Sequence, residues 1–321
     1  LVDVILVEDN PSKTFKTREG FQHYDWQDIT TVLGEDEWII PRRSDTVRSF
    51  GYYMAWRHGS PYILTLDDDC YPPTPEKDGF GYNDGAIGFI STHIRALESR
   101  QRWFNTLNKA KPRGIPFYNV GKMSNVVINH GLWTNVLDYD APTQLANPAK
   151  EEFSFDSRLI PVGQYFPMCG MNVLWKRDAT VLMYHLLMGK SHSEWPGAVD
   201  KDDLVAFPFD RFGDIWAGVF AKKVADVKGL AIATGLPYIH HDRASNPFAN
   251  LKKEANGIEV NERLWEWVDQ APMFPGHSLP NVYEQLGQHI GNYKEFPQYA
   301  EYFAHLGKAM KTWAKLFTEG K

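Results

Sequence analysis

Three consecutive carboxylates, Asp67, Asp68 and Asp69, follow a run of strand-forming residues at 62–66. Burying an unpaired carboxylate is costly, so the predicted strand must end where the acids begin. Ligands of open α/β sheets bind at the carboxyl ends of strands. Three acids repel one another there unless a cation lies among them, and oxygen ligands suit Mg²⁺ or Mn²⁺. The run therefore indicates a metal-dependent nucleotide-sugar site, and a solvated turn that caps a helix is the alternative.

Further candidate binding residues lie near the ends of other predicted elements. Asp9 follows an apolar run at residues 1–7 that is typical of a buried parallel strand. Its carboxylate could accept hydrogen bonds from a base or ribose, or only cap a turn. Ser44 or Asp45 is the candidate N-cap for the helix that is predicted next. Arg48 falls outside the apolar stripe of that helix and faces either solvent or a phosphate or uracil group.

Two later segments carry candidate acid–base and metal-binding groups. Asp214 opens a predicted helix, where an acid either complements the helix dipole or acts as a general base. His240 and His241 follow a predicted strand at 229–233. Paired histidines in that position either complete a metal site or form a hydrogen-bonded turn.

Segments rich in small, polar and aromatic residues join the predicted elements. Residues 129–133 and 138–145 are irregular, and loops of such composition carry function more often than packing. Gly170, within the segment 166–172, would allow backbone N–H groups to approach a ligand closely. Residues 109–117 form a basic loop whose cations are either exposed or directed at the anionic site.

The elements that must position these groups alternate between strands and helices, as in an α/β fold. Predicted strands lie at 1–7, 38–40, 62–66 and 229–233, and predicted helices at 47–58 and 86–97. Residues 173–189 are predicted to be helical in part. From about residue 255 amphipathic helical patterns dominate, which indicates a helical extension or an oligomer surface without a catalytic pattern.

The totals for the 321 residues argue against several classes of protein. Lys and Arg number 34 against 40 for Asp and Glu, and this acidic balance argues against nucleic acid as the main partner. The two cysteines, Cys70 and Cys169, are too few for a disulfide scaffold, so we expect a reducing, cytoplasmic location. No stretch approaches the roughly 18 apolar residues of a membrane span. The N-terminal run leads directly into acids and is interpreted as a strand and not a signal peptide.

Several of these stretches together resemble one family, the reversibly glycosylated polypeptides, also known as UDP-arabinopyranose mutases. The resemblance is collinear from residue 1 to about residue 255. Its segments are 63–70 (ILTLDDDC), 130–133 (HGLW), 138–145 (DYDAPTQL), 166–172 (FPMCGMN), 214–218 (DIWAG), 234–239 (TGLPYI), 244–248 (ASNPF) and 250–254 (NLKKE). Identities of seven and eight consecutive residues are far beyond chance.

The resemblance implies a GT-A-like (Rossmann-like) fold, an α/β mixed sheet flanked by helices, in which a strand ends in an Asp-x-Asp motif for a divalent metal and UDP. Asp67 and Asp69, with His241, are the implied ligands of Mn²⁺ or Mg²⁺. Arg113 resembles the reversibly glycosylated arginine, and Asp214 the acid opposite the sugar; these two are the candidate catalytic residues. The candidate substrate-binding residues are Asp9, Asp45, Arg48, Asp67, Asp68, Lys122, His130, Trp133, Asp138, Asp140, Cys169, Gly170, Asn172 and Trp216.

Two departures from the family pattern concern the substrate pocket. The family begins with a further strand, and this chain starts at what resembles the second one, so part of the uridine pocket would be missing or supplied differently. The family also has another arginine shortly after the Arg113 position, where only Lys122 offers a nearby cation. Lysine does not replace arginine where bidentate phosphate contact is needed.

The resemblance therefore implies an enzyme that interconverts the pyranose and furanose forms of UDP-arabinose, with reversible self-glycosylation as an associated reaction. The alternatives are a nucleotide-sugar-dependent glycosyltransferase with an external acceptor, and a non-catalytic UDP-sugar-binding subunit. We expect residues 1–254 to form the nucleotide-sugar-binding catalytic domain and residues 255–321 a C-terminal helical extension. A homo- or hetero-oligomer is expected, with no membrane span.

Overall fold

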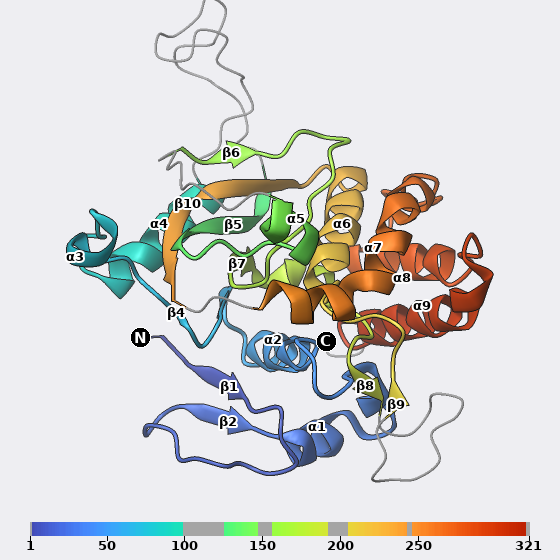
Figure 1. Ribbon diagram of the computed structural model, residues 1–321, viewed down its shortest axis with the longest axis horizontal. Coiled ribbons are helices and arrows are strands. Elements are labelled where there is room, and N and C mark those ends of the chain that lie inside the picture. Colours follow the sequence, from blue (N-terminus) through green and yellow to red (C-terminus); the bar gives the residue numbers. More distant parts are fainter. Residues whose placement is uncertain (1, 99–124, 147–155, 192–204, 243–245, 319–321) are drawn as a thin grey trace, which may run out of the picture.

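The computed structural model describes residues 2–98, 125–146, 156–191, 205–242 and 246–318. A mixed β-sheet lies at its centre (Figure 1). The strands run in the order β3-β7-β5-β10-β4, and β6 pairs with β10. Only β5 and β10 pair in parallel among them. Their bounds are β3 Tyr62–Leu66, β4 Cys70–Tyr71, β5 Val126–Asn135, β6 Arg158–Leu159, β7 Asn172–Lys176 and β10 Ala231–His241.

Helices cover both faces of this sheet, and the side chains of its strands enter three apolar clusters. On β5, Val126 belongs to the cluster with α4 (Ala86–Glu98), whereas Val127 belongs to the large core. That large core also contains buried residues of α2 (Val47–Arg57) and α6 (Gly213–Val227). The predicted α/β fold, a mixed sheet flanked by helices, is confirmed.

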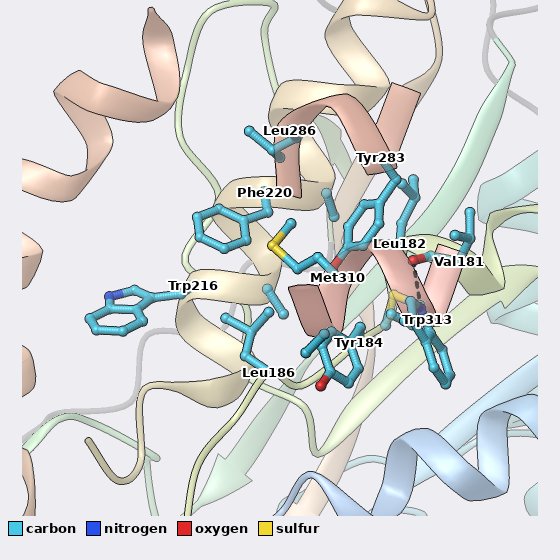
Figure 2. Close-up of a cluster of buried hydrophobic side chains, with 14 of the residues drawn as sticks. Val181, Leu182, Tyr184, Leu186, Trp216, Phe220, Tyr283, Leu286, Met310 and Trp313 are labelled. Atoms are coloured by element: carbon cyan, nitrogen blue, oxygen red, sulfur yellow. Dashed lines mark hydrogen bonds between the residues drawn. The ribbon is translucent and has the colours of Figure 1, made fainter. Parts of the chain in front are cut away.

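The C-terminal helices share the large core with the sheet and α6. They are α7 (Pro247–Asp269), α8 (Leu279–Ile290) and α9 (Ala300–Lys315), which follows the short 3₁₀ helix η3 (Pro297–Tyr299). Figure 2 shows Tyr283 of α8 and Trp313 of α9 among side chains of α6 and of the segment around η2 (Arg177–Leu182). The Trp313 indole N–H donates to the carbonyl of Val181 at 2.9 Å. The predicted helical C-terminal region is confirmed, and the boundary expected between residues 254 and 255 falls inside α7; the two domains stay a prediction.

The N-terminal region forms its own small layer. The predicted first strand is present as β1 (Ile5–Val7), but it is half-buried and pairs in parallel with β2 (Gln22–Tyr24) in a separate sheet. The strand predicted at 38–40 is wrong: residues 34–39 form the 3₁₀ helix η1 (Gly34–Ile39). Ile39 and Ile40 are buried by that turn, and three apolar residues alone do not distinguish a strand from a buried turn.

The remaining elements are short apart from α1. They are α1 (Trp26–Leu33), α3 (Pro75–Asp78), α5 (Ala141–Ala146), and the hairpin of β8 (Lys190–Ser191) with β9 (Val205–Ala206). None of the helices that the structure describes is both long and apolar enough to cross a membrane.

Candidate functional site

The end of β3 and the end of β10 bring a carboxylate and an imidazole together. The antiparallel pairing of β4 with β10 sets Cys70 opposite His241, and this places His241 Nε2 3.7 Å from Asp69 Oδ2. The other ring nitrogen, Nδ1, lies 2.8 Å from the carbonyl oxygen of Val136. Because a carbonyl can only accept, Nδ1 carries a proton, and Nε2, on the side of Asp69, is the ring atom that a neutral imidazole would offer to a metal. Two acceptors at this separation suit a shared divalent cation.

The other two acids of the motif have different surroundings. Asp67 Oδ1 lies 2.6 Å from an Arg48 nitrogen, and Arg48 also donates to the carbonyl of Gly170 at 3.3 Å. Burial lowers the pKa of the Arg48 guanidinium, but the charge of Asp67 outweighs this and raises the pKa well above its ordinary value. Asp68 is exposed. No group of three or more metal-binding side chains occurs in the ranges that the structure describes.

The peptide Cys169–Gly170, which precedes β7, connects the remaining polar groups. The Gly170 N–H donates to Asp214 Oδ2 at 2.8 Å, and the Cys169 N–H donates to His130 Nε2 at 3.3 Å. The Cys169 thiol donates to Asp138 Oδ2 at 3.1 Å. A side chain at position 170 would come within 3.0 Å of the His185 ring. The Gly170 N–H thus binds a protein group, and the close approach of this backbone to a ligand stays a prediction.

Asp214 lies in the first turn of α6 beside a second carboxylate. A Cβ atom at Gly213 would meet the Asp45 oxygens at 3.0 and 3.1 Å, so Asp45 sits against the start of this helix. Burial, and then the negative charge of Asp45, raise the pKa of Asp214 to about 7. Burial also raises the pKa of Asp45, but the hydrogen bond from His185 Nδ1 at 3.0 Å outweighs this and lowers it. The two acids therefore differ in protonation near neutral pH.

His130 and Trp133, both on β5, form the aromatic side of the site. Their rings meet edge to face with centroids 5.9 Å apart. Since His130 Nε2 accepts from the backbone of Cys169, Nδ1 carries the proton and donates to Thr234 Oγ1 at 3.0 Å. Burial lowers the pKa of His130 to about 4, so the ring is neutral at physiological pH.

Asn172 belongs to a buried polar chain that holds β5, β7 and α4 together. Its amide oxygen lies 2.8 Å from His93 Nε2, and its amide N–H groups donate to the carbonyls of Leu132 and Pro237. The other His93 nitrogen accepts from Asn129. Burial lowers the pKa of His93 to about 3, which keeps the ring neutral. The chain aligns the strand ends from which the site is built.

Gly131→Ala tests this alignment. A methyl group there would lie 2.2 Å from Asn172 Nδ2 and 2.4 Å from the Pro237 carbonyl oxygen. Because the amide must move and its buried hydrogen bonds are lost, we expect the free energy of unfolding to fall by about 2–4 kcal/mol in urea denaturation. Gly276→Ala is the control, since nothing lies within 4 Å of its new methyl group. Equal stability of the two variants would contradict a tight contact at Gly131.

Other candidate residues lie apart from this cluster. Asp9 accepts from the indole of Trp26 and the backbone of Arg43. Asp140 caps α5 through Thr143. The Trp216 indole is buried and donates to Asn261 at 3.0 Å. Contact of Asp9, Asp140 and Trp216 with substrate stays a prediction. Arg113 and Lys122 lie outside the described residues.

Two groups beside the cluster carry no signal in the sequence. His185 is completely buried, and its Nε2 has no hydrogen-bond partner in the structure's described portion. Arg211 precedes α6 and pairs with Glu254 of α7 at 2.8 Å. Both residues stand outside the motifs recognised in the sequence; Arg211 is three positions before Asp214, whereas only the folded chain brings His185 to it.

Comparison with known proteins places the chain in one family. The model of the family described as "Reversibly glycosylated polypeptide" matches residues 2–321. A probable UDP-arabinopyranose mutase 1 of Solanum tuberosum is 36% identical over 98% of this chain and 83% of its own length. A probable UDP-arabinopyranose mutase 1 of Zea mays is 35% identical over 98% of this chain and 84% of its own length. The UDP-arabinopyranose mutase 1 of Arabidopsis thaliana is 34% identical over 98% of this chain and 85% of its own length. The family expected from the sequence is confirmed: this chain belongs to the reversibly glycosylated polypeptides.

Proposed function

We propose that this protein is a UDP-sugar mutase that interconverts the pyranose and furanose forms of UDP-arabinose. The observation that carries the proposal is the similarity over 98% of the chain to relatives named UDP-arabinopyranose mutase. The polar cluster around Gly170 supports it, because an acid with a pKa near neutral lies there among buried groups.

The interconversion requires one proton to move between two sugar oxygens. The C1–O bond to UDP breaks with its electron pair on the phosphate oxygen. O4 then forms a bond to C1, the C1–O5 bond breaks with its electron pair on O5, and the same phosphate oxygen of UDP bonds to C1 again. In between, the pyranose ring oxygen O5 gains a proton and O4 loses one, so protons balance overall. A single acid–base group can serve both transfers if its pKa lies near the working pH. Asp214 has this property, and we assign it that role.

The proposed UDP end of the site lies at the carboxyl ends of β3 and β10. Asp69 and His241 would hold Mn²⁺ or Mg²⁺, since such ions commonly bind one or two protein ligands together with substrate phosphates. The bound ion would offset the negative charge that develops on the departing diphosphate. Arg48 and Asp67, paired at 2.6 Å, would fix the neighbouring wall of the site through the Gly170 carbonyl.

Three finer assignments belong to the same proposal. Arg113 and Lys122 would stabilise phosphate charge, and reversible glycosylation would occur at Arg113, where a carboxylate must first remove a proton from the guanidinium. A cytoplasmic location is inferred from the two cysteines of the chain. The exposed faces of the C-terminal helices would serve a homo- or hetero-oligomer.

The decisive experiment incubates the protein with UDP-arabinopyranose and Mn²⁺, without an acceptor, and separates the nucleotide sugars. We expect UDP-arabinofuranose to appear and to decrease when a chelator is added. Release of UDP or labelling of the protein, without furanose, would instead indicate a glycosyltransferase. Binding of UDP with no product would indicate a UDP-sugar-binding subunit.

A further inference from the structure

Arg211 is held in an unusual backbone conformation just before α6. Its φ angle is 64°, in the left-handed region that non-glycine residues seldom occupy. Such conformations cost roughly 1–3 kcal/mol and persist only where the surroundings impose them, often at ligand sites. Helix α7 supplies the constraint on both sides. Glu254 accepts a hydrogen bond from Arg211 Nε at 2.8 Å. About one turn later in α7, Gly257 packs so closely against the Phe212 ring that a Cβ atom at position 257 would lie 2.3 Å from it.

Glu254 connects Arg211 to the segment that carries Asp138. The Glu254 side chain is 2% exposed, and its second oxygen accepts from the backbone N–H of Ala141 at 2.7 Å. The buried Glu254 carboxylate thus binds both the segment before α6 and the first residue of α5. Asp214 and Asp138 belong to the chain segments at these two helix starts, and each accepts a hydrogen bond from the Cys169–Gly170 region.

The guanidinium of Arg211 retains donors for a ligand. Its side chain is 32% exposed, and of its three nitrogens only Nε has a hydrogen-bond partner in the described ranges. Burial lowers the pKa of Arg211, but Glu254 and then the charges of Asp138 and Asp214 outweigh this and raise it. The group is therefore a permanent cation within electrostatic reach of both site carboxylates.

We propose that Arg211 contacts the pentose ring of the bound nucleotide sugar through its two terminal nitrogens. This inference rests on the proposed function and assigns the sugar subsite to the space between Arg211, Asp138 and Asp214. Arg211 is paired with Glu254, and Asp138 and Asp214 are further acids within its electrostatic reach, so a phosphate would meet more acids than cations there. A neutral polyol matches the same groups, because its hydroxyls both accept from the guanidinium and donate to the acids. Glu254 is the positioning residue.

Binding measurements with two probes, UDP-arabinopyranose and UDP, test the assignment. Arg211→Gly suits the left-handed backbone and removes the cation, whereas Arg211→Lys keeps the charge and loses the planar fork. We expect both variants to bind UDP-arabinopyranose about 10- to 100-fold more weakly and UDP with unchanged affinity. The control is Lys253→Ala, which removes a neighbouring exposed cation of α7 that pairs with Asp210 at 3.5 Å; neither affinity should change.

The outcomes separate this inference from the proposed function. Equal weakening of both probes would place Arg211 at the diphosphate, and no weakening of either would remove it from the site; both results overturn the inference while the mutase stands. A wild-type protein that binds UDP but not the sugar nucleotide would overturn both the inference and the proposed function.

Glu254→Gln should raise KM for the sugar nucleotide more than it lowers kcat, and an unchanged KM would reject the role of Glu254 in positioning Arg211.

Discussion

Asp214→Asn is expected to lower kcat of the mutase reaction by about 10²- to 10⁴-fold, the range typical of general acid–base groups. The amide keeps the size of the side chain and can accept from the Gly170 N–H, as Asp214 does at 2.8 Å. It cannot take up and return a proton. The affinity for UDP should therefore persist while turnover is lost, as measured by furanose formation at saturating UDP-arabinopyranose.

The pH dependence of stability provides an independent readout of the same residue. The ordinary pKa of an Asp is 3.8 and that of Asp214 in the fold is about 7. Between these values the folded state binds more protons than the unfolded state, so its stability falls as the pH rises and the loss is complete above about pH 7. Asp214→Asn should lack this loss and be more stable than wild type at pH 8. In the control Asp210→Asn, an acid that is paired with Lys253 on the surface, the wild-type profile should remain. A wild-type profile in Asp214→Asn as well would refute the raised pKa.

The strand that ends in three acids can be predicted because its signal is local. Burial alternates along β3, with Ile63 and Thr65 buried and Leu66 exposed, and unpaired acids are costly to bury, so sequence alone places the turn. The meeting of Asp69 with His241 is a different case. It joins residues 172 positions apart and is expected only from family resemblance, because nothing in the His240–His241 pair indicates that β10 pairs with β4.

Central strand β7 shows where local patterns fail. The pattern of residues 173–189 predicts partial helix, and the first part is instead a strand between β3 and β5. A strand buried on both faces has no alternation of polar and apolar residues, and a run of five such residues also fits a helix. The partly helical character is correct only for η2 (Arg177–Leu182), which is a 3₁₀ helix.

Several contacts of the site depend on tertiary structure, and the spacing of residues in the sequence does not reveal them. Asp45 is a plausible helix cap by sequence, but Thr46 occupies the N-cap position and Asp45 turns to His185, 140 residues away. Arg211 stands outside the family segments, and Glu254, although it ends the segment 250–254, has no sequence feature that points to Arg211. The physical reason is that each pair gives a hydrogen-bond partner to a buried polar group, His185 or Glu254, and tertiary packing, which residue spacing does not reveal, decides which partner is near.

The last expected result concerns the proposed metal site. Asp69→Asn should weaken Mn²⁺-dependent binding of UDP by at least about 10- to 100-fold, the range seen when groups around a metal are removed. The amide oxygen is a weaker ligand than a carboxylate. Asp67, the third predicted ligand, pairs with Arg48 at 2.6 Å, so His241 Nε2, 3.7 Å from Asp69 Oδ2, would be the remaining ligand proposed for the ion. The measurement is a titration of UDP at fixed Mn²⁺ and again with a chelator.

Asp68→Asn is the matched control, because it removes the same charge one position earlier from an exposed side chain. If the effect came only from the total negative charge of the motif, the two variants would weaken binding equally, and this would contradict a ligand role for Asp69. Asp67→Asn should act differently again. It releases Arg48 from its partner at 2.6 Å, so the affinity for UDP should change in chelator as well as in Mn²⁺. The loss of UDP affinity depends on Mn²⁺ only when a metal ligand is replaced, and this dependence distinguishes Asp69 from Asp67 and Asp68.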